Sequence, residues 1–341
     1  MRRRKRQRLR EADRLIVLSG GTGTPKLLVG LAKILEPEDL TVIANTADDL
    51  WISGNLVSPD LDTVIYTLAG MIDRNKWWGI ENDSFKTHDF LKGLSHQELL
   101  ALGDLDRAIH IFRSDLLREG LTISMATETL CRSLKVEARV VPMTDDPVST
   151  MISTPVGEMH LQEFWVGRGG RPDVTAIRFR GIGDALPSLG FLAALERAAE
   201  AGEPVLIGPS NPVSSIGPIL ALRGVRDKLK KISRRGRERG REGRKSRVVA
   251  ISPLVGGEPV SGPAAAFMRA WGYQVSDQGV ADILGCVDLM VVSPGSDYRG
   301  PAVRLDTVMK DEADSLRLAK EIVKIVDEEM ETEAEEEAGA V

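Results

Sequence analysis

The chain has 341 residues, of which 42% are hydrophobic and 28% are charged, so it can build a core and is not a fully disordered chain. No stretch approaches the roughly 18–20 uninterrupted apolar residues of a membrane span, and the N-terminus lacks the apolar centre of a signal peptide. Two cysteines, Cys131 and Cys286, exclude a disulfide framework and a Cys-rich zinc site. We therefore expect a cytoplasmic protein.

The net charge of −5 combines segments of opposite sign. Residues 1–10 carry +7, residues 226–247 carry +9 and residues 327–341 carry −8, which leaves −13 for the rest of the chain. We expect an acidic body with a basic extension over 1–13, a basic loop insertion over 226–247 and a solvated acidic tail over 326–341.

The first elements in chain order form a strand–turn–helix–strand unit. Arg14–Leu18 is an apolar run that ends in Ser-Gly-Gly, Pro25–Leu35 has leucines and isoleucine at helical spacing, and Leu40–Ala44 is a second apolar run. This pattern predicts a parallel α/β sheet.

The same pattern returns late in the chain. Val205–Ile207, Arg247–Ile251 and Val287–Val292 are short apolar runs, and the first two are followed by Gly/Pro/Ser loops and helices. Strands that end in such loops are typical of a ligand site at the carboxyl edge of a doubly wound sheet.

Between these halves the pattern differs. Residues 84–135 indicate helices, and Ser149–Thr154, His160–Val166 and Val174–Arg180 indicate antiparallel strands. The predicted fold class is therefore α/β, with a Rossmann-like doubly wound, mostly parallel sheet and an inserted helical and antiparallel β subdomain. The core is expected over 14–83 and 186–325 and the inserted cap over 84–185, with a strand near 138–142 as a candidate to join the core sheet.

Four groups of residues could carry chemistry. The first is the Gly-rich turn at 19–26 (SGGTGTPK), which fits neither the Walker loop nor the dinucleotide fingerprint. Its glycines allow close approach of a ligand, and the helix start attracts anions, so we interpret it as an anion site; a tight turn alone is the alternative. The predicted phosphate-binding residues here are Gly20, Gly21, Thr22, Gly23, Thr24 and Lys26.

The second group is an aspartate cluster that follows the second strand. Asp48, Asp49, Asp60 and Asp62 lie within fifteen residues of one another, and such a concentration of carboxylates favours a cation. Hard oxygen ligands point to Mg²⁺, so these four are the candidate metal ligands. Alternatively, Asp60 or Asp62 caps a helix over Thr63–Ile72.

The third group lies on a helix expected near 98–118. Its spacing places an apolar face opposite a polar face that holds Arg107 and His110, which could bind an anion or could simply be solvated. His110 has no second ligand at metal spacing. The apolar face comprises Leu105, Ala108, Ile109, Phe112 and Leu116, and the polar face comprises Arg107, His110, Ser114 and Arg118.

The fourth group is the loop at 208–216 (GPSNPVSSI), whose small hydroxyl and amide side chains suit a phosphate or a nucleoside; a Pro/Ser helix cap is the alternative. Trp51, Trp77 and Trp78 could offer aromatic faces, although tryptophan is more often core. The predicted donor-binding residues of this loop are Gly208, Ser210, Asn211, Ser214 and Ser215.

Taken together, these motifs resemble the 2-phospho-L-lactate transferase family, CofD. The resemblance covers roughly residues 14–325 in collinear order. It rests on SGGTGTPKLL, NTADDLWISGNLVSPDLDTVIYTLAG, WWGIENDSF, GDLDRAIH, PMTDDPVST, EFWVG, IGPSNPVSSIGPI and VSGPAA. The family often has a second Arg where Leu105 stands.

The resemblance implies transfer of a phospholactyl group from lactyl-2-diphospho-5′-guanosine to the ribityl hydroxyl of the deazaflavin FO, with GMP and coenzyme F-420 lacking glutamates as products. It also implies a Mg²⁺ requirement and a homodimer. Carried over by motif, Asp48, Asp62 and Arg107 are the catalytic candidates, and Asp62, Arg107 and His110 are the acceptor-binding candidates.

Three questions stay open from the sequence. The donor could carry lactate or enolpyruvate, and a regulatory nucleotide-sugar-binding protein of the same superfamily would bind without transfer. The Arg-rich segments could bind nucleic acid, but they are Gly-interspersed and lack aromatic residues for base stacking, so this reading is disfavoured.

Overall fold

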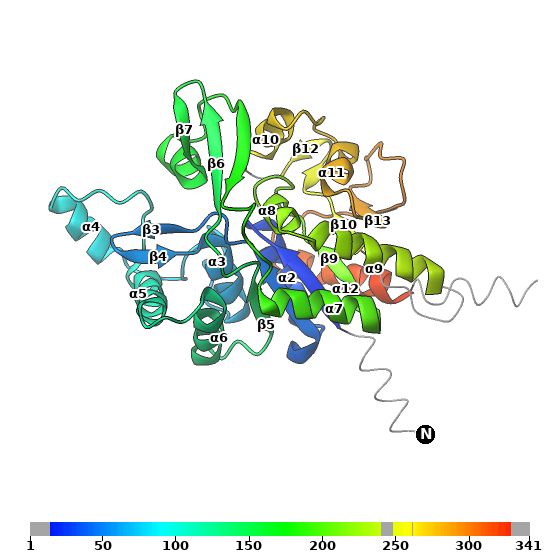
Figure 1. The fold of residues 1–341 in the computed structure, drawn as a ribbon, viewed down its shortest axis with the longest axis horizontal. Helices are drawn as coiled ribbons and strands as arrows, with labels where there is room; N and C mark the ends of the chain where they lie inside the picture. The colour runs from blue at the N-terminus through cyan, green and yellow to red at the C-terminus, as the bar shows by residue number, and fades with distance from the viewer. Residues whose placement is uncertain (1–13, 240–247, 261, 329–341) are drawn as a thin grey trace, which may run out of the picture.

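The computed structural model describes residues 14–239, 248–260 and 262–328 (Figure 1). The predicted basic extension over 1–13 therefore lies outside the described residues. The same holds for residues 240–247 of the predicted basic insertion and for residues 329–341 of the predicted acidic tail.

Seven parallel strands form the central sheet, in the order β14-β13-β10-β9-β1-β2-β5. The chain builds the sheet outward from β1 in one direction and outward from β9 in the other, so the topological switch point lies between these two strands. The predicted doubly wound parallel sheet is confirmed. The strands are β1 (Leu15–Ser19), β2 (Leu40–Ala44), β5 (Arg139–Pro142), β9 (Val205–Ile207), β10 (Val248–Ile251), β13 (Leu289–Val292) and β14 (Ala302–Arg304).

Both faces of this sheet are buried, which is why its strands are continuous apolar runs. Ile16 and Leu18 of β1 pack into one core, and Leu15 and Val17 pack into the other. The first core is covered by α7 (Leu189–Ala201), α8 (Gly217–Ala221), α9 (Val225–Arg239), α10 (Ala264–Ala270) and α11 (Asp277–Leu284). The second is covered by α2 (Gly23–Leu31), α3 (Pro59–Leu68), α6 (Ile123–Ser133) and α12 (Glu312–Glu328).

Apart from the short turn η1, which leads directly into the start of β2, the remaining elements project from the carboxyl edge of the sheet, as Figure 1 shows for the arm of α4, β3 and β4 and for the sheet of β6 and β7. They include two antiparallel hairpins, a three-stranded antiparallel sheet in the order β7-β6-β8 and short helical turns. Their bounds are η1 (Pro37–Asp39), β3 (Leu50–Ile52), β4 (Asn55–Val57), α4 (Lys86–Gly93), α5 (Asp104–Arg118), β6 (Ser149–Thr154), β7 (Gly157–His160), η2 (Glu163–Gly167), β8 (Ala176–Arg180), β11 (Leu254–Val255) and β12 (Glu258–Pro259).

Two expected elements differ in the structure. The strand expected over His160–Val166 ends at His160 and is followed by the single π-helical turn η2. Leu161 and Phe164, three residues apart, are both buried, and that spacing suits a helical turn rather than a strand.

The basic insertion expected as a loop over 226–247 is helical as far as Arg239, in α9. Val225, Leu229 and Ile232 recur at helical spacing and are fully buried, so packing on the sheet selects the helix. Among the described residues, no helix is both long and apolar enough to cross a membrane.

Helices α2 and α12 approach so closely that one position requires glycine. A Cβ at Gly30 would lie 2.2 Å from the carbonyl oxygen of Ser315, a backbone atom that cannot move independently. We predict that Gly30→Ala lowers the free energy of unfolding by about 1–3 kcal/mol through overpacking, measured by urea denaturation.

Gly93→Ala is the matched control, because Gly93 also lies in a helix but has open space around the added carbon. This change should be neutral or slightly stabilising. Equal unfolding midpoints for the two variants would contradict the close approach of α2 and α12.

Candidate active site

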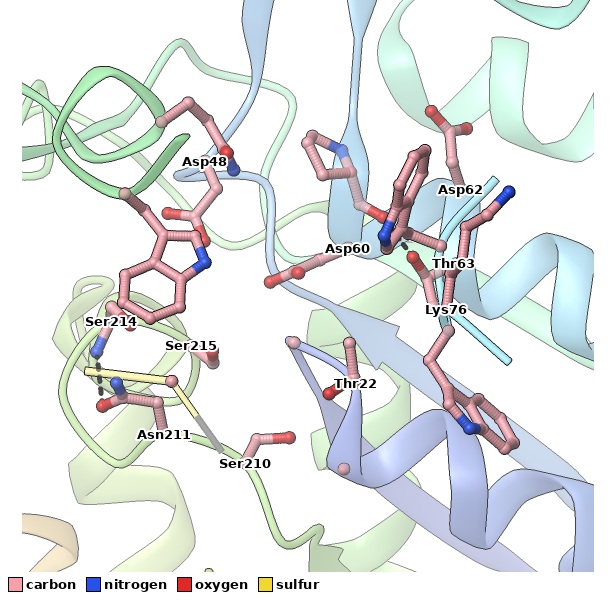
Figure 2. A pocket seen from close by; sticks show the side chains of 18 of the residues that line it. Thr22, Asp48, Asp60, Asp62, Thr63, Lys76, Ser210, Asn211, Ser214 and Ser215 are labelled. Carbon is pink, nitrogen blue, oxygen red and sulfur yellow. Dashed lines mark hydrogen bonds between the residues drawn. The ribbon is translucent and has the colours of Figure 1, made fainter. Parts of the chain in front are cut away.

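A cavity of about 640 Å³ opens at the carboxyl edge of the sheet, over the switch point between β1 and β9. It is lined by the loops that follow β1, β2, β9 and β10 and by residues of the inserted segment, including Leu161, Gln162 and Trp165. Figure 2 shows the side chains around it. Doubly wound sheets bind ligands at this place because the strand order reverses there, so the connections after the two neighbouring strands lead in opposite directions and leave a crevice.

The Gly-rich turn after β1 and the loop after β9 are in direct contact. A Cβ at Gly23 would lie 1.9 Å from the carbonyl oxygen of Pro209, and a Cβ at Gly20 would lie 2.7 Å from the Cβ of Ser215. The hydroxyls of Thr24 and Ser210 are hydrogen-bonded at 2.6 Å, and the Ser210 hydroxyl also donates to the carbonyl of Gly20. The glycines therefore let the turn after β1 and the loop after β9 meet.

Most of the predicted donor-binding residues line the cavity, but three do not. Thr24 is fully buried and bonds Ser210, and a Cβ at Gly208 would collide with Thr24, so Thr24, Gly208 and Gly20 shape the loops from behind. The predicted residues that line the cavity are Gly21, Thr22, Gly23, Lys26, Ser210, Asn211, Ser214 and Ser215.

Asp48 and Asp60 present buried carboxylates to the cavity. Figure 2 shows them pointing toward each other, with Asp62 set apart. Asp60 accepts a hydrogen bond from Asn45 Nδ2 at 2.9 Å, whereas Oδ1 of Asp48 is buried and has no hydrogen-bond partner among the described residues. Burial raises the pKa of both carboxyls, and the charge of Asp60 raises the pKa of Asp48 further.

Asp49 lies behind this pair and does not line the cavity. Its carboxylate accepts a hydrogen bond from the Ser58 hydroxyl at 2.6 Å, and burial raises its pKa. The four predicted metal ligands are thus not one cluster.

Asp62 differs from its neighbours because positive groups surround it. Both of its oxygens accept from the guanidinium of the fully buried Arg113, and His110 Nε2 lies 3.2 Å from Oδ2. Burial alone would raise the pKa of Asp62, but the Arg113 charge and the His110 contact hold it well below its usual range. Asp62 is therefore an ionised, immobilised carboxylate on the cavity wall.

Of the two alternatives for the polar face of the third helix, a solvated surface is wrong for three of its residues. That helix, α5, begins at Asp104 rather than near 98, and its polar residues Arg107, His110 and Ser114 are buried while Leu105 and Phe112 are 53% and 41% exposed. Buried charges are tolerated here because each has an ionised partner.

His110 is held between two carboxylates. Its Nε2 lies 3.2 Å from Asp106 as well as from Asp62, and Asp106 also accepts a hydrogen bond of 2.6 Å from the Tyr66 hydroxyl. Burial lowers the pKa of His110, but the hydrogen bonds to Asp106 and Asp62 raise it to about 9. The imidazole is consequently charged at neutral pH, and it lines the cavity.

Arg107 does not line the cavity. Its guanidinium makes two hydrogen bonds to Glu98, of 2.9 and 2.6 Å, and Glu98 also accepts from the Ser53 hydroxyl at 2.5 Å and lies 3.1 Å from His88. These contacts join the β3–β4 hairpin, α4 and α5. The guanidinium of Arg107, a predicted catalytic and acceptor-binding residue, is therefore paired with Glu98 in the structure.

Lysines and tryptophans form another wall. Lys26 Nζ lies 5.4 Å from the ring centre of Trp77, and Lys76 Nζ lies 5.2 Å from that of Trp78. Burial lowers the pKa of Lys26, so a nearby anion would stabilise its charge. Trp51 and Trp78 are not core residues, being 58% and 44% exposed, and Trp51 does not line the cavity.

The oxygen ligands that this site offers fit Mg²⁺ only if a substrate supplies the remaining ligands. Within the described part of the chain, no group of three or more His, Cys, Asp or Glu side chains is arranged to hold a metal. Asp48 and Asp60 supply two buried, like-charged carboxylates with an unpartnered oxygen. Mg²⁺ commonly takes one or two carboxylates plus substrate phosphates, so the pair fits that ion.

Several residues of the site were missed from the sequence. Arg113 lies one turn after His110 on α5, where helical spacing could have suggested it. Asn45 at the end of β2 bonds Asp60, and its position in the NTADD motif was a signal. Ser252 after β10 and Trp165 of η2 also line the cavity. The Gly/Pro/Ser loop after Ile251 and the EFWVG motif were the available signals, but neither residue was singled out.

Comparison with known proteins places these features in context. The family model described as 2-phospho-L-lactate transferase CofD matches residues 15–331. A 2-phospho-L-lactate transferase of Methanosarcina mazei is 50% identical over 268 residues, which cover 79% of this chain and 82% of that protein. The corresponding protein of Methanococcoides burtonii is 44% identical over 320 residues, covering 91% and 99%.

Among solved structures, a Bacillus halodurans member of the UPF0052 family shares the fold. The TM-score is 0.56 at 18% sequence identity, and the alignment covers 91% of this chain and 99% of that one. At this identity the likeness supports the fold alone.

The charged state of His110 generates a pH prediction. Its pKa is raised in the folded protein, so its contribution to stability is fully present below the unfolded value of about 6.5 and is lost as pH rises through about 9. Between pH 6 and 9.5 we expect this group to contribute a loss of roughly 3 kcal/mol in the free energy of unfolding. His110→Gln should remove this decrease in the free energy of unfolding between pH 6 and 9.5.

His96→Gln is the control, because His96 is an exposed imidazole outside the cavity. Urea denaturation at several pH values measures both variants. A His110→Gln curve parallel to that of the unaltered protein would show that His110 is not charged in the folded state.

Proposed function

The chain belongs to the CofD family of 2-phospho-L-lactate transferases, and from this premise we propose that it transfers the 2-phospholactyl group of lactyl-2-diphospho-5′-guanosine to the ribityl hydroxyl of FO, with Mg²⁺. The products are coenzyme F-420 without glutamates and GMP. One observation carries the proposal: the Gly-rich turn after β1 and the Ser-rich loop after β9 meet at the switch point, beside two buried carboxylates that line the same cavity.

The donor's diphosphate suits the start of α2. Gly21, Thr22 and Gly23 line the cavity there, and the N-terminus of this nine-residue helix presents backbone N–H groups that favour an anion. Lys26 adds an ammonium whose charge an anion would stabilise. The guanosine monophosphate portion then lies toward Ser210, Asn211, Ser214 and Ser215 of the β9–α8 loop.

Asp48 and Asp60 are the proposed metal ligands. When bound, Mg²⁺ would supply charge neutralisation for the diphosphate and for the two carboxylates. Without a cation, burial raises the pKa of both carboxyls, and the charge of Asp60 raises the pKa of Asp48 further. Asn45 and the contact with the turn after β1 fix Asp60 in direction, so the ligand pair is positioned before substrate arrives.

Asp62 and His110 are proposed to face the acceptor. Because the pKa of Asp62 is lowered, its carboxylate is a weak base and suits accepting a hydrogen bond from the ribityl hydroxyl rather than removing the proton early. The hydroxyl oxygen forms the new bond to phosphorus as the bond from phosphorus to the bridging oxygen breaks. That oxygen leaves with GMP, and the hydroxyl proton passes to Asp62 late in the step. In a loose transition state, positioning and charge contribute more than base strength.

Arg107 is not assigned a catalytic role, because its guanidinium is paired with Glu98. We assign the positive charge at this part of the site to Arg113 and His110 instead. The homodimer implied by the resemblance and the cytoplasmic location expected from the composition remain proposals. Light scattering of the purified protein tests the dimer.

The reaction is tested by mixing the protein with FO, lactyl-2-diphospho-5′-guanosine and Mg²⁺, with the products measured by mass spectrometry. We expect GMP and the phospholactyl adduct of FO in equal amounts. A parallel reaction with the enolpyruvyl guanosine donor decides which acid is transferred. Binding of both substrates without release of GMP would favour a regulatory protein over a transferase.

The metal ligands are tested by Asp48→Asn and Asp60→Asn. Each change removes a charge that would hold the cation, so we expect turnover at a fixed Mg²⁺ concentration to fall by at least about 100-fold. The folded protein should not suffer, because each change also removes a repelling buried charge; without Mg²⁺ the unfolding temperature of Asp48→Asn should equal or exceed that of the unaltered protein.

Asp89→Asn is the control, because Asp89 lies on the exposed surface of α4 outside the cavity. Its turnover should match that of the unaltered protein. Near-normal turnover of Asp48→Asn and Asp60→Asn at saturating substrates would refute the assignment.

A further inference from the structure

Three tryptophans line the cavity, and two of them already have a cation over the ring. The ammonium of Lys26 lies over Trp77, and that of Lys76 lies over Trp78. Trp165 is 45% exposed, and among the residues that the structure describes no ammonium or aromatic ring lies over it. Its face is therefore available to a ligand.

The turn that carries Trp165 is anchored beside the loops of the second half of the sheet. The preceding residue, Phe164, is 1% exposed, and its ring centre lies 5.8 Å from that of Phe267 in α10. Pro263 and Ala264 at the start of α10 line the same cavity, as does Ser252 after β10. Trp165 is thereby attached to the side of the cavity that β10 and α10 form.

The Lys76 side of the cavity is distinct from this one. Figure 2 shows Asn211 and Ser214 across the cavity from Lys76 and Thr63. Asn211 and Ser214 lie in the loop that follows β9, and β9 is paired with β10 in the sheet. Lys26 lies in α2, and Trp77 lies in the segment before α4. The free indole therefore belongs with the nucleotide-facing loops.

A glycine turn holds the indole in place. Gly169 and Gly170 both have positive φ, +62° and +63°, and a Cβ at Gly170 would lie 2.9 Å from Cζ3 and 3.0 Å from Cε3 of Trp165. The ring thus rests against the bare backbone of Gly170. At Gly169, by contrast, an added Cβ would meet only the Arg171 side chain, at 3.7 Å.

We propose that Trp165 is a binding residue for the guanine ring of the donor, which stacks on its indole, and that Gly170 positions the indole for this contact. The inference rests on the proposed guanosine donor and adds the group that recognises its base. A base has a π-face that stacks on an aromatic side chain, and such stacking contributes about 1–3 kcal/mol per base.

The test is isothermal titration of GMP and of GDP, each with Mg²⁺, into the unaltered protein, Trp165→Ala and Trp165→Phe. We expect Trp165→Ala to weaken both nucleotides by about 5- to 150-fold, which is the stacking contribution converted at 1.4 kcal/mol per tenfold. Trp165→Phe should recover part of the loss. Inorganic pyrophosphate, which has no base, should bind all three proteins equally.

The glycines supply a matched pair. Gly170→Ala and Gly169→Ala introduce the same backbone strain, because both positions have positive φ, but only the first displaces the indole. Gly170→Ala should therefore weaken GMP and GDP, whereas Gly169→Ala should leave them unchanged. An equal effect of the two glycine changes would overturn the positioning role.

The remaining outcomes separate this inference from the proposed function. If the unaltered protein binds GMP and GDP but Trp165→Ala binds them within twofold as tightly, stacking is wrong and the guanosine donor survives. FO is titrated in parallel. If Trp165→Ala weakens the binding of FO but not that of GMP and GDP, the indole belongs to the acceptor site and the inference is overturned. If the unaltered protein binds neither GMP nor GDP, the guanosine donor and the stacking role both fail.

Discussion

The site is organised by one electrostatic constraint: buried carboxylates of equal sign must each be neutralised or remain protonated. Asp62 is neutralised from within the chain, by Arg113 and His110. Asp48 and Asp60 are not, and burial raises their pKa values. The aspartates therefore differ in what they can bind. The charge of Asp62 is already compensated, whereas Asp48 and Asp60 favour an incoming cation together with an anionic donor.

The rest of the architecture serves this arrangement. The parallel sheet brings the turn after β1 and the loop after β9 into contact, and glycines at 20 and 23 remove the side chains that would keep them apart. Helix α5 places Arg113 and His110 inside the protein, where their charges compensate Asp62. The turn η2 places the indole of Trp165 at the cavity. The core sheet thus provides the two Gly/Ser-rich loops at the cavity, and the elements between β4 and β9 provide charge compensation and an aromatic surface.

The sequence predicted the sheet and most of the cavity walls, because both depend on local patterns. Short apolar runs such as Leu40–Ala44 between turn signals favour strands buried on both faces, and Gly/Ser-rich loops after parallel strands fall at the carboxyl edge by topology. Periodicity also located α5, but it could not say which face is buried. The sequence left open whether Arg107 and His110 are solvated or bind an anion, because their partners, Glu98 and Asp62, become neighbours only through folding. The π-helical turn η2 and the helix α9, which replaces part of the expected loop, likewise depend on distant packing partners. For Phe164 of η2 this partner is Phe267.

The central claim, that Asp48 and Asp60 form a cation site completed by the donor's phosphates, is tested most directly by thermal unfolding against Mg²⁺ concentration, with and without GDP. A ligand that binds only the folded state raises the unfolding temperature with its concentration. We predict that Mg²⁺ stabilises the unaltered protein, that GDP increases this effect, and that Asp48→Asn abolishes the response to Mg²⁺. An unaltered protein that does not respond to Mg²⁺, or an Asp48→Asn variant that responds as strongly, would contradict the account.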